Sequence, residues 1–240
     1  MKKNDKEFRV LFGIEPSQVK ADCVLMPMIP KGALSWFGLK DLSKGRLFHA
    51  ASSSSLTLIH TGIGAPFAGD VVLYLKKTGC KNLFLFGSCG LVRQTNELKI
   101  ASQVIPFKCY PYESFSEMLS GKNLSQKACY PDKGLYEKFL RASESYGVKK
   151  ANCATLGSLK LEREMSDTFE KLKIDVVDME CSAFFSAASH CGIKATALFY
   201  VSDVITEKPF YEELSQDLKS GLSLSIKNSV DLLCEFIEKN

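Results

Sequence analysis

Glycines and carboxylates occur at four places in this chain where a ligand could be bound and given a proton. Gly62-Ile63-Gly64 and Gly87-Ser88-Cys89-Gly90 each follow an apolar run, Asp178-Met179-Glu180 precedes one, and Ser202-Asp203 ends another. Glycine lets a backbone approach a ligand closely, and its N–H groups can bind an anion or a hydroxyl. A carboxylate at the end of an apolar strand becomes partly buried, which raises its pKa toward that of a general acid.

Each of these segments also has an ordinary structural explanation when it is taken alone. A Gly-x-Gly after a strand is often only a tight turn. Asp203 could cap a helix, and Asp178 or Glu180 in a first helical turn could simply interact with the helix dipole. It is their occurrence together, each beside an apolar segment, that favours a binding site.

Short apolar strands alternating with helical segments must position these residues. Strands are expected at 9–14, 23–28, 56–61, 82–86, 102–107, 151–156 and 195–201. Helices are expected at 65–78, 179–191 and 211–238, the last because apolar residues recur there at three- and four-residue intervals. The serine-, lysine- and tyrosine-rich segment 110–133 is expected to be an insertion over the sheet.

The strands are apolar on both faces, so the sheet must be covered by helices on both sides. The sequence therefore predicts an α/β fold with three layers (α/β/α), formed as a single domain by residues 1–240. In such folds ligands bind beyond the carboxyl ends of the strands, where the glycines and carboxylates are expected.

Composition narrows the class of protein further. The chain has 240 residues, of which 45% are hydrophobic, enough for one substantial core. Its 31 basic and 27 acidic residues leave a net charge of +4, too small to favour a nucleic-acid partner. No apolar run approaches the ~18 residues that span a bilayer, and the charged N-terminus does not resemble a signal peptide. We expect a cytoplasmic protein without a membrane partner.

The nine cysteines do not have the spacing of a disulfide framework or a zinc site. Their number is odd and no C-x-x-C pair occurs, whereas both kinds of site usually need paired cysteines. We predict reduced, mostly buried thiols and no bound metal.

In this order, the segments resemble those of the nucleoside phosphorylase family, above all the hexameric bacterial purine nucleoside phosphorylases and the uridine phosphorylases. The resemblance runs from about residue 12 to about residue 203. The matching segments are 21–27 (the first core strand), 61–64 (a glycine turn), 86–91 (the phosphate and ribose loop), 98–106 (a supporting strand), 177–180 (the ribose-binding signature) and 200–203 (the catalytic Ser-Asp). The resemblance implies a mixed central sheet of the phosphorylase/hydrolase type and a nucleoside as ligand.

The resemblance also implies a role for each matching residue. Asp203 would be the general acid that protonates the base as the C1′–N bond breaks. Glu180 would accept hydrogen bonds from the ribose 2′ and 3′ hydroxyls, and Met179 would pack against the sugar. Ser88 would hold the phosphate beneath the sugar. The other residues implied to bind substrate are Gly64, Gly87, Asp178 and Ser202.

The resemblance breaks down where phosphate should be bound. The phosphorylases hold phosphate with two arginines, whose positions are occupied here by Leu85 and Gly32. Leu85 is expected to make that wall of the pocket apolar. Lys31, Arg46 and Arg93 could replace the arginines, although each also suits an ordinary surface position. Lys31 is the first choice because it lies one residue from a lost arginine.

The hydrolytic relatives match incompletely as well. Their water-activating glutamate aligns with Ile29, and Glu15 is at best a substitute. The segment 155–159 lacks the acid and the ring of the family's base-stacking segment. A histidine that a neighbouring subunit supplies aligns with Phe12, and only Lys208 lies near the position of a basic residue that often follows the catalytic Asp.

Three functions therefore stay open. Phosphorolysis of a nucleoside, expected to be a purine nucleoside, is the first, with phosphate as co-substrate and no cofactor. A nucleosidase that uses water is the alternative, and a nucleoside-binding relative without turnover is the third. The family also implies a homo-oligomer built from dimers, possible as a hexamer, for which 36–37 and 107–112 are candidate contacts.

Overall fold

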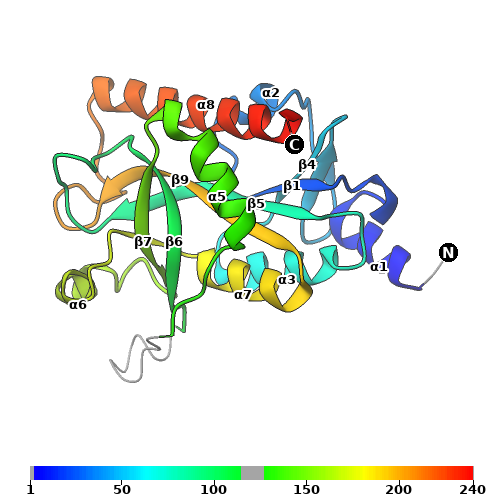
Figure 1. Ribbon diagram of the computed structural model, residues 1–240, viewed down its shortest axis with the longest axis horizontal. Coiled ribbons are helices and arrows are strands. Elements are labelled where there is room, and N and C mark those ends of the chain that lie inside the picture. The colour runs from blue at the N-terminus through cyan, green and yellow to red at the C-terminus, as the bar shows by residue number, and fades with distance from the viewer. Residues whose placement is uncertain (1–2, 115–126, 240) are drawn as a thin grey trace.

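The computed structural model describes residues 3–114 and 127–239 and is drawn in Figure 1. The strands in this part of the chain are β1 (Asp22–Met26), β2 (Ser43–Lys44), β3 (His49–Ser52), β4 (Leu56–His60), β5 (Asn82–Leu91), β6 (Gln103–Tyr112), β7 (Lys149–Leu156), β8 (Val176–Asp178) and β9 (Lys194–Val204). The α-helices are α1 (Lys3–Phe12), α2 (Ala33–Trp36), α3 (Ala65–Leu75), α5 (Lys133–Ala142), α6 (Ser166–Lys171), α7 (Cys181–Cys191) and α8 (Gln216–Lys239).

The strands form one mixed sheet, in the order β2-β3-β4-β1-β5-β8-β7-β6-β9. β1 pairs in parallel with β4 and with β5. Two pairs are antiparallel: β5 with β8, and β6 with β9. The predicted α/β fold with a mixed sheet is confirmed. β9 pairs in addition with β5, in parallel, and so closes β5, β8, β7, β6 and β9 into a ring. The sequence analysis did not predict this closure.

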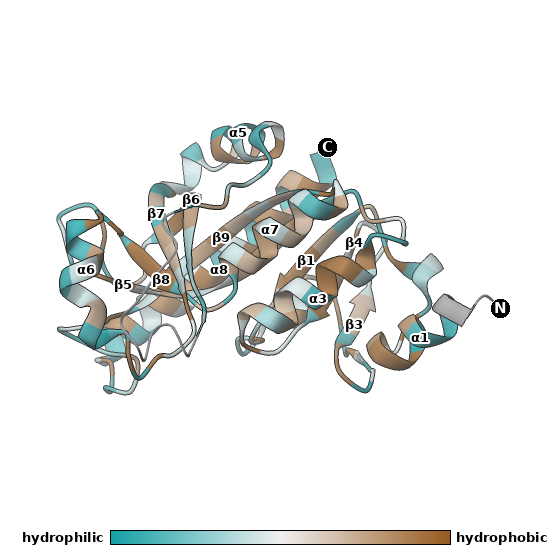
Figure 2. Ribbon diagram, turned by 90° about the horizontal axis from the view of Figure 1, so that it is seen from below, coloured by the Kyte–Doolittle hydropathy of each residue, from teal (hydrophilic) through white to brown (hydrophobic). Residues whose placement is uncertain are grey.

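Helices cover both faces of the sheet because successive residues of a strand point to opposite sides. In β1, Cys23 and Leu25 pack in a core with α1, α3 and α7. Val24 and Met26 pack in a second core with α2, α5 and α8. Figure 1 shows α3 and α7 on one side of the sheet and α8 on the other, and Figure 2 shows that the strands between them are largely hydrophobic.

The strand expected at 9–14 is wrong, because Lys3–Phe12 forms the helix α1. Phe8 and Phe12 are four residues apart, so a helix places their rings on one face, where they stack at 4.2 Å between centroids. Phe12 also packs against the Phe48 ring at 4.8 Å. The window 9–14 was too short to show this helical period, since its apolar residues resemble a continuous run.

The other differences concern where elements end. β5 and β9 continue past their expected ends, so 87–90 and 202–203 lie within strands and not in turns after them. The closure of the ring explains this, since β5 and β9 pair with each other along both segments. The helix expected from 179 begins at Cys181, and the last helix begins at Gln216 and not at 211. Of the expected insertion 110–133, residues 110–112 belong to β6 and residues 115–126 lie outside the described part.

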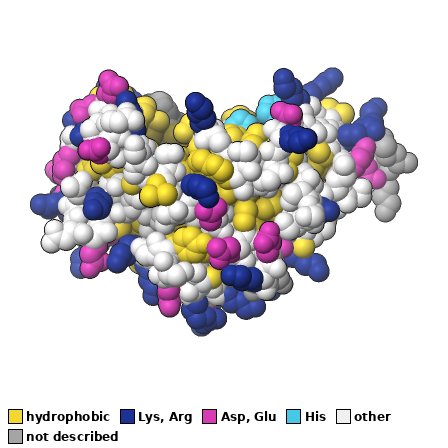
Figure 3. All heavy atoms as spheres, turned by 90° about the horizontal axis from the view of Figure 1, so that it is seen from above, with side chains coloured by type: hydrophobic (Ala, Val, Ile, Leu, Met, Phe, Trp, Pro, Cys, Tyr) yellow, Lys and Arg dark blue, Asp and Glu magenta, His cyan; other side chains and the backbone are white. Residues whose placement is uncertain are grey.

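The surface shows no single dominant charge on the face drawn in Figure 3, where basic and acidic side chains are interspersed. In the described residues, no helix is long and apolar enough to cross a membrane.

Two of the expected oligomer contacts, Phe37 and Tyr112, are buried inside the subunit, so they cannot contact a partner. Phe107 is 39% exposed and remains available.

Candidate active site

A cavity of about 370 Å³ is lined by the last residues of β5, β8 and β9 and by loops that follow β1, β4 and β7. Its volume suits a small ligand, since such pockets commonly measure ~300–1,000 Å³. The predicted site residues that line it are Gly87, Ser88, Asp178, Met179, Glu180, Ser202 and Asp203. Gly64 contacts the site through Glu180, whereas Lys31 is exposed and does not line the cavity.

Glu180 lies at one end of the cavity and is 5% exposed. It is the N-cap residue of α7, so its backbone direction is set by the start of the helix. Its Oε1 accepts a hydrogen bond of 2.6 Å from the N–H of Gly64, in the turn after β4. Burial raises the pKa of Glu180 to about 7, while the backbone N–H groups of Gly64 and Met179 lower it. Both protonation states are therefore accessible near neutral pH.

Asp178 holds the start of α7 in place from behind Glu180. Its Oδ2 accepts the N–H groups of Glu180 (2.9 Å) and Cys181 (2.6 Å), and its Oδ1 accepts the hydroxyl of Thr155 (2.6 Å). Although Asp178 lines the cavity, both of its oxygens are thus engaged by protein groups. Burial raises its pKa. The resemblance implied that Asp178 contacts the substrate, whereas this geometry suits a residue that positions Glu180.

Asp203 lies in β9, directly opposite Gly90 of β5 at a register shift between the two strands. It is 5% exposed, and its Oδ1 accepts a hydrogen bond of 2.5 Å from the hydroxyl of Ser202. Burial raises the pKa of Asp203, and the bond from Ser202 lowers it. A buried carboxyl with a raised pKa is suited to donate a proton.

Gly90 leaves the space that the Asp203 carboxylate occupies. A Cβ at residue 90 would lie 3.2 Å from Oδ2 of Asp203 and 3.0 Å from Cγ2 of Ile205. Gly90, the second glycine of the predicted Gly87-Ser88-Cys89-Gly90 segment, is therefore needed for the close approach of a side chain and not for a turn.

Ser88 and Tyr200 lie opposite each other in β5 and β9, and both line the cavity. Burial raises the pKa of Tyr200 to about 12, so it remains a neutral phenol over the whole physiological range. This part of the cavity therefore offers hydroxyl groups but no charge.

Glu162 is a site residue that the sequence analysis missed. It follows β7, lines the cavity and is only 4% exposed. Burial and, to a smaller extent, the nearby charge of Asp203 raise its pKa to about 7. Its sequence context, Leu161-Glu162-Arg163-Glu164, is typical of a solvated surface segment, so no local pattern indicates its burial.

No Lys, Arg or His among the residues that the structure describes lines this cavity. Arg93 is an exposed partner of Glu170 at 4.0 Å, and Glu15, the possible water activator, instead pairs with Arg9 at 3.2 Å. The expectation that Leu85 forms a wall of the pocket is wrong, because its side chain is fully buried in the core that contains α3 and α7. The β5 residues at the cavity begin only at 87.

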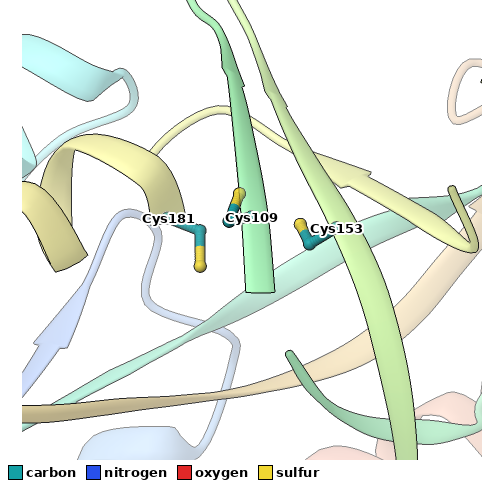
Figure 4. A group of neighbouring side chains, drawn as sticks. All are labelled: Cys109, Cys153 and Cys181. Atoms are coloured by element: carbon teal, nitrogen blue, oxygen red, sulfur yellow. The ribbon is translucent and has the colours of Figure 1, made fainter. Parts of the chain in front are cut away.

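Three cysteine thiols form a buried group behind Asp178, from β6, β7 and α7 (Figure 4). The sulfur atoms of Cys109, Cys153 and Cys181 lie within 4.8 Å of one another, and Cys153 donates to Oδ1 of Asp178 at 3.6 Å. A metal would require thiolates, whose charges would add to that of the buried carboxylate. Burial also raises the pKa of Cys153 and Cys181, whereas hydrogen bonds with these two thiols and with Thr155 lower the pKa of Cys109 despite its burial. The absence of a metal stays a prediction.

The family model described as "Phosphorylase superfamily" matches residues 40–238 of this chain. The chain belongs to the phosphorylase superfamily. Within it, a DeoD-type purine nucleoside phosphorylase of Chromobacterium violaceum is 25% identical over 184 residues, which cover 74% of this chain and 76% of that protein. One of Tolumonas auensis is 29% identical over 152 residues, 60% and 61% of the two chains.

Solved structures of this superfamily fold include two kinds of enzyme. A uridine phosphorylase from Vibrio fischeri has a TM-score of 0.74 and 15% identity, and the match covers 95% of both chains. A 5′-methylthioadenosine/S-adenosyl homocysteine nucleosidase from Campylobacter jejuni has a TM-score of 0.71 and 17% identity, with 92% and 100% covered. The superfamily supports an enzyme that acts on a small-molecule nucleoside, and its members differ in whether phosphate or water is the acceptor.

Proposed function

We propose that this superfamily member is a nucleosidase, which hydrolyses the N-glycosidic bond of a purine nucleoside with water as the acceptor. The observation that carries the proposal is the charge of the cavity. Glu162, Asp178, Glu180 and Asp203 line it, and no basic side chain of the described residues does. A phosphate dianion would enter this site without a compensating charge, which is costly in a buried environment. A water molecule meets no such barrier.

The magnitude of the phosphate penalty supports the same acceptor. A hydrogen bond to a charged group contributes ~1.5–3 kcal/mol, and every ~1.4 kcal/mol changes an affinity tenfold. Because no basic side chain of the described residues lines the cavity, phosphate should bind at least ~100-fold more weakly here than in a site where two arginines hold it. Lys31 is exposed outside the cavity and does not compensate.

The proposed reaction begins with the base near Asp203 and the ribose near Glu180. The neutral carboxyl of Asp203 gives its proton to a ring nitrogen of the base, and the electron pair of the breaking C1′–N bond passes to the base. The sugar passes through an oxocarbenium-like state, which the carboxylate of Glu180 stabilises while it holds the 2′ and 3′ hydroxyls. Gly64 and Asp178 keep Glu180 in position through the bonds described above.

Water completes the reaction by bonding to C1′ on the face opposite the departing base. The hydroxyl groups of Ser88 and Tyr200 are available in the cavity to position it. The proton that the water loses restores the neutral carboxyl of Asp203. The products are the free base and ribose, and no cofactor takes part.

The test is the release of base from inosine, adenosine and guanosine, measured with and without inorganic phosphate, together with the sugar product. We expect the same rate under both conditions, free ribose as product, and no change in Lys31→Ala. Phosphorolysis is the competing reaction, because the relatives by sequence are purine nucleoside phosphorylases. Ribose 1-phosphate formed with saturation by submillimolar phosphate would overturn hydrolysis, and no release from any nucleoside would overturn an enzyme for these substrates.

A further inference from the structure

Glu162 is a buried acid without a hydrogen-bond partner among the described residues. Its side chain lines the cavity, is 4% exposed, and accepts no hydrogen bond from the residues that the structure describes. The adjacent Arg163 is engaged elsewhere, since its guanidinium donates to the carbonyl of Thr206 at 3.2 Å and to the hydroxyl of Tyr211 at 3.1 Å. A buried carboxyl that faces a cavity and has no partner among the described residues is available to a ligand in that cavity.

The surroundings of Glu162 define what such a ligand must be. Leu156, Leu159 and Phe210 also line the cavity, and they offer apolar surface that suits the faces of an aromatic ring. Asp203 lies close enough that its charge raises the pKa of Glu162. The ring that Asp203 protonates is therefore within the region that Glu162 faces. A carboxyl group accepts hydrogen bonds in either protonation state, so the complementary group on the ring is an N–H donor.

We propose that Glu162 determines base specificity, by accepting a hydrogen bond from an N–H group on the six-membered ring of a purine. This inference rests on the proposed function for its substrate class. The donor is the N1–H group in a 6-oxopurine or the 6-amino group in adenine. A pKa of about 7 leaves part of the Glu162 population ionised at neutral pH, and the carboxylate is the stronger acceptor for such an N–H group.

The size of the effect follows from the cost of leaving this carboxyl unpaired. A site built to hydrogen-bond an N–H group discriminates strongly against an analogue that lacks it. For one bond to a charged acceptor, the expected loss is about 10–100-fold in kcat/KM, and most of it should appear in KM because the bond is made before the chemical step.

Two pairs of nucleosides test the proposal, each differing in one N–H donor: inosine with 1-methylinosine, and adenosine with purine riboside. In the parent, we expect the first member of whichever pair is cleaved to be preferred by about 10–100-fold. Glu162→Ala should reduce that preference at least tenfold, toward the ratio of the rates at which the two nucleosides are cleaved without enzyme. Glu162→Gln keeps an acceptor oxygen and should reduce the preference less. Comparing ratios between variants cancels the different reactivities of the bases.

Glu164→Ala is the matched control, because Glu164 lies two residues away and is exposed. It should keep the preference of the parent. An unchanged preference in Glu162→Ala, in a variant with the parent's circular dichroism spectrum, would overturn the proposal. Binding of hypoxanthine and 1-methylhypoxanthine, or of adenine and purine, by calorimetry gives the same comparison without turnover. Base release measured with and without phosphate tests the proposed hydrolysis separately from the role of Glu162. A requirement for phosphate would reject hydrolysis, but the preference within each nucleoside pair could still be compared between the parent and Glu162→Ala.

Discussion

The backbone N–H of Gly64 donates to Oε1 of Glu180 over 2.6 Å, although the two residues are 116 positions apart in the chain. The bond joins the turn after β4 to the first turn of α7. Gly64 can make it because it adopts φ 120° and ψ 147°, a conformation that is essentially confined to glycine. The glycine turn and the acidic segment, which the sequence shows as separate features, thus form one unit that orients the carboxylate assigned to the ribose.

Glu180→Gln should discriminate less than the parent between ribonucleosides and 2′-deoxyribonucleosides. An amide has one acceptor oxygen, whereas an ionised carboxylate can accept both sugar hydroxyls. Because the pKa of Glu180 is about 7, the preference of the parent for ribose should strengthen as the pH rises through 7. The measurement is KM for the two sugars between pH 5.5 and 8.5. A variant that keeps both the preference and its pH dependence would remove Glu180 from the ribose.

Asp203→Asn should lower kcat by about 10²–10⁴-fold and change nucleoside affinity little, because a general acid acts only as the bond breaks. The acid must be protonated, and burial raises its pKa, so kcat of the parent should fall as the pH rises through that raised value. Single-turnover rates across pH, with affinities from equilibrium binding, check both points. Equal losses in affinity and rate would instead indicate a role in binding or folding.

Gly90→Ala should reduce kcat and stability together, because its Cβ would lie 3.2 Å from Oδ2 of Asp203 and 3.0 Å from Ile205. Relieving this contact requires Asp203 to move, and small displacements of a catalytic group are costly. Gly69→Ala is the control: this glycine lies in α3, and an added Cβ would make only an ordinary contact at 3.8 Å with Ala183. It should raise the melting temperature slightly. Parent-like activity in Gly90→Ala would contradict the importance of the close approach.

Glu162→Gln should stabilise the protein more at pH 8 than at pH 5. The folded state raises the pKa of Glu162 to about 7, whereas an unfolded glutamate has a pKa of ~4.3. Between these values the folded chain binds more protons than the unfolded chain, so the free energy of unfolding falls as pH rises. The amide avoids this loss. Melting temperatures at the two pH values measure it, with Glu164→Gln, an exposed acid, expected to show no such difference.

A homo-oligomer built from dimers is the remaining expectation from the family. Large apolar side chains are exposed at the cavity, with Met28 at 50% and Ile63 at 49%, and in α3, with Phe67 at 39%. Such a group commonly marks a contact surface. Light scattering at micromolar concentration should give at least twice the mass of one 26.6 kDa chain. Phe67→Ser should weaken the assembly, and a monomeric parent would refute the prediction.

The α/β class, most of the strands and the cavity-lining acids Glu180 and Asp203 could be predicted from the sequence. These features depend on local information: apolar runs bounded by glycine, and short motifs whose order is typical of one family. Residues 9–14 resemble a strand because a window of six mostly apolar residues fits the period of a helix as well as that of a strand. Phe8 and Phe12 show the helical spacing only over a longer window.

Only the tertiary structure decided how the site is assembled and what charge it carries. Closure of the ring through β5 and β9 carries both strands past their expected ends and places Gly90 opposite Asp203. In the folded chain Glu162 is buried, although its neighbours in sequence resemble a solvated surface, and Lys31 lies outside the cavity. A local pattern reports which residues are apolar or charged, whereas burial and charge balance depend on long-range contacts between segments that the sequence keeps far apart. The proposals on the acceptor and the base rest on this second level, because both depend on which charges share one cavity.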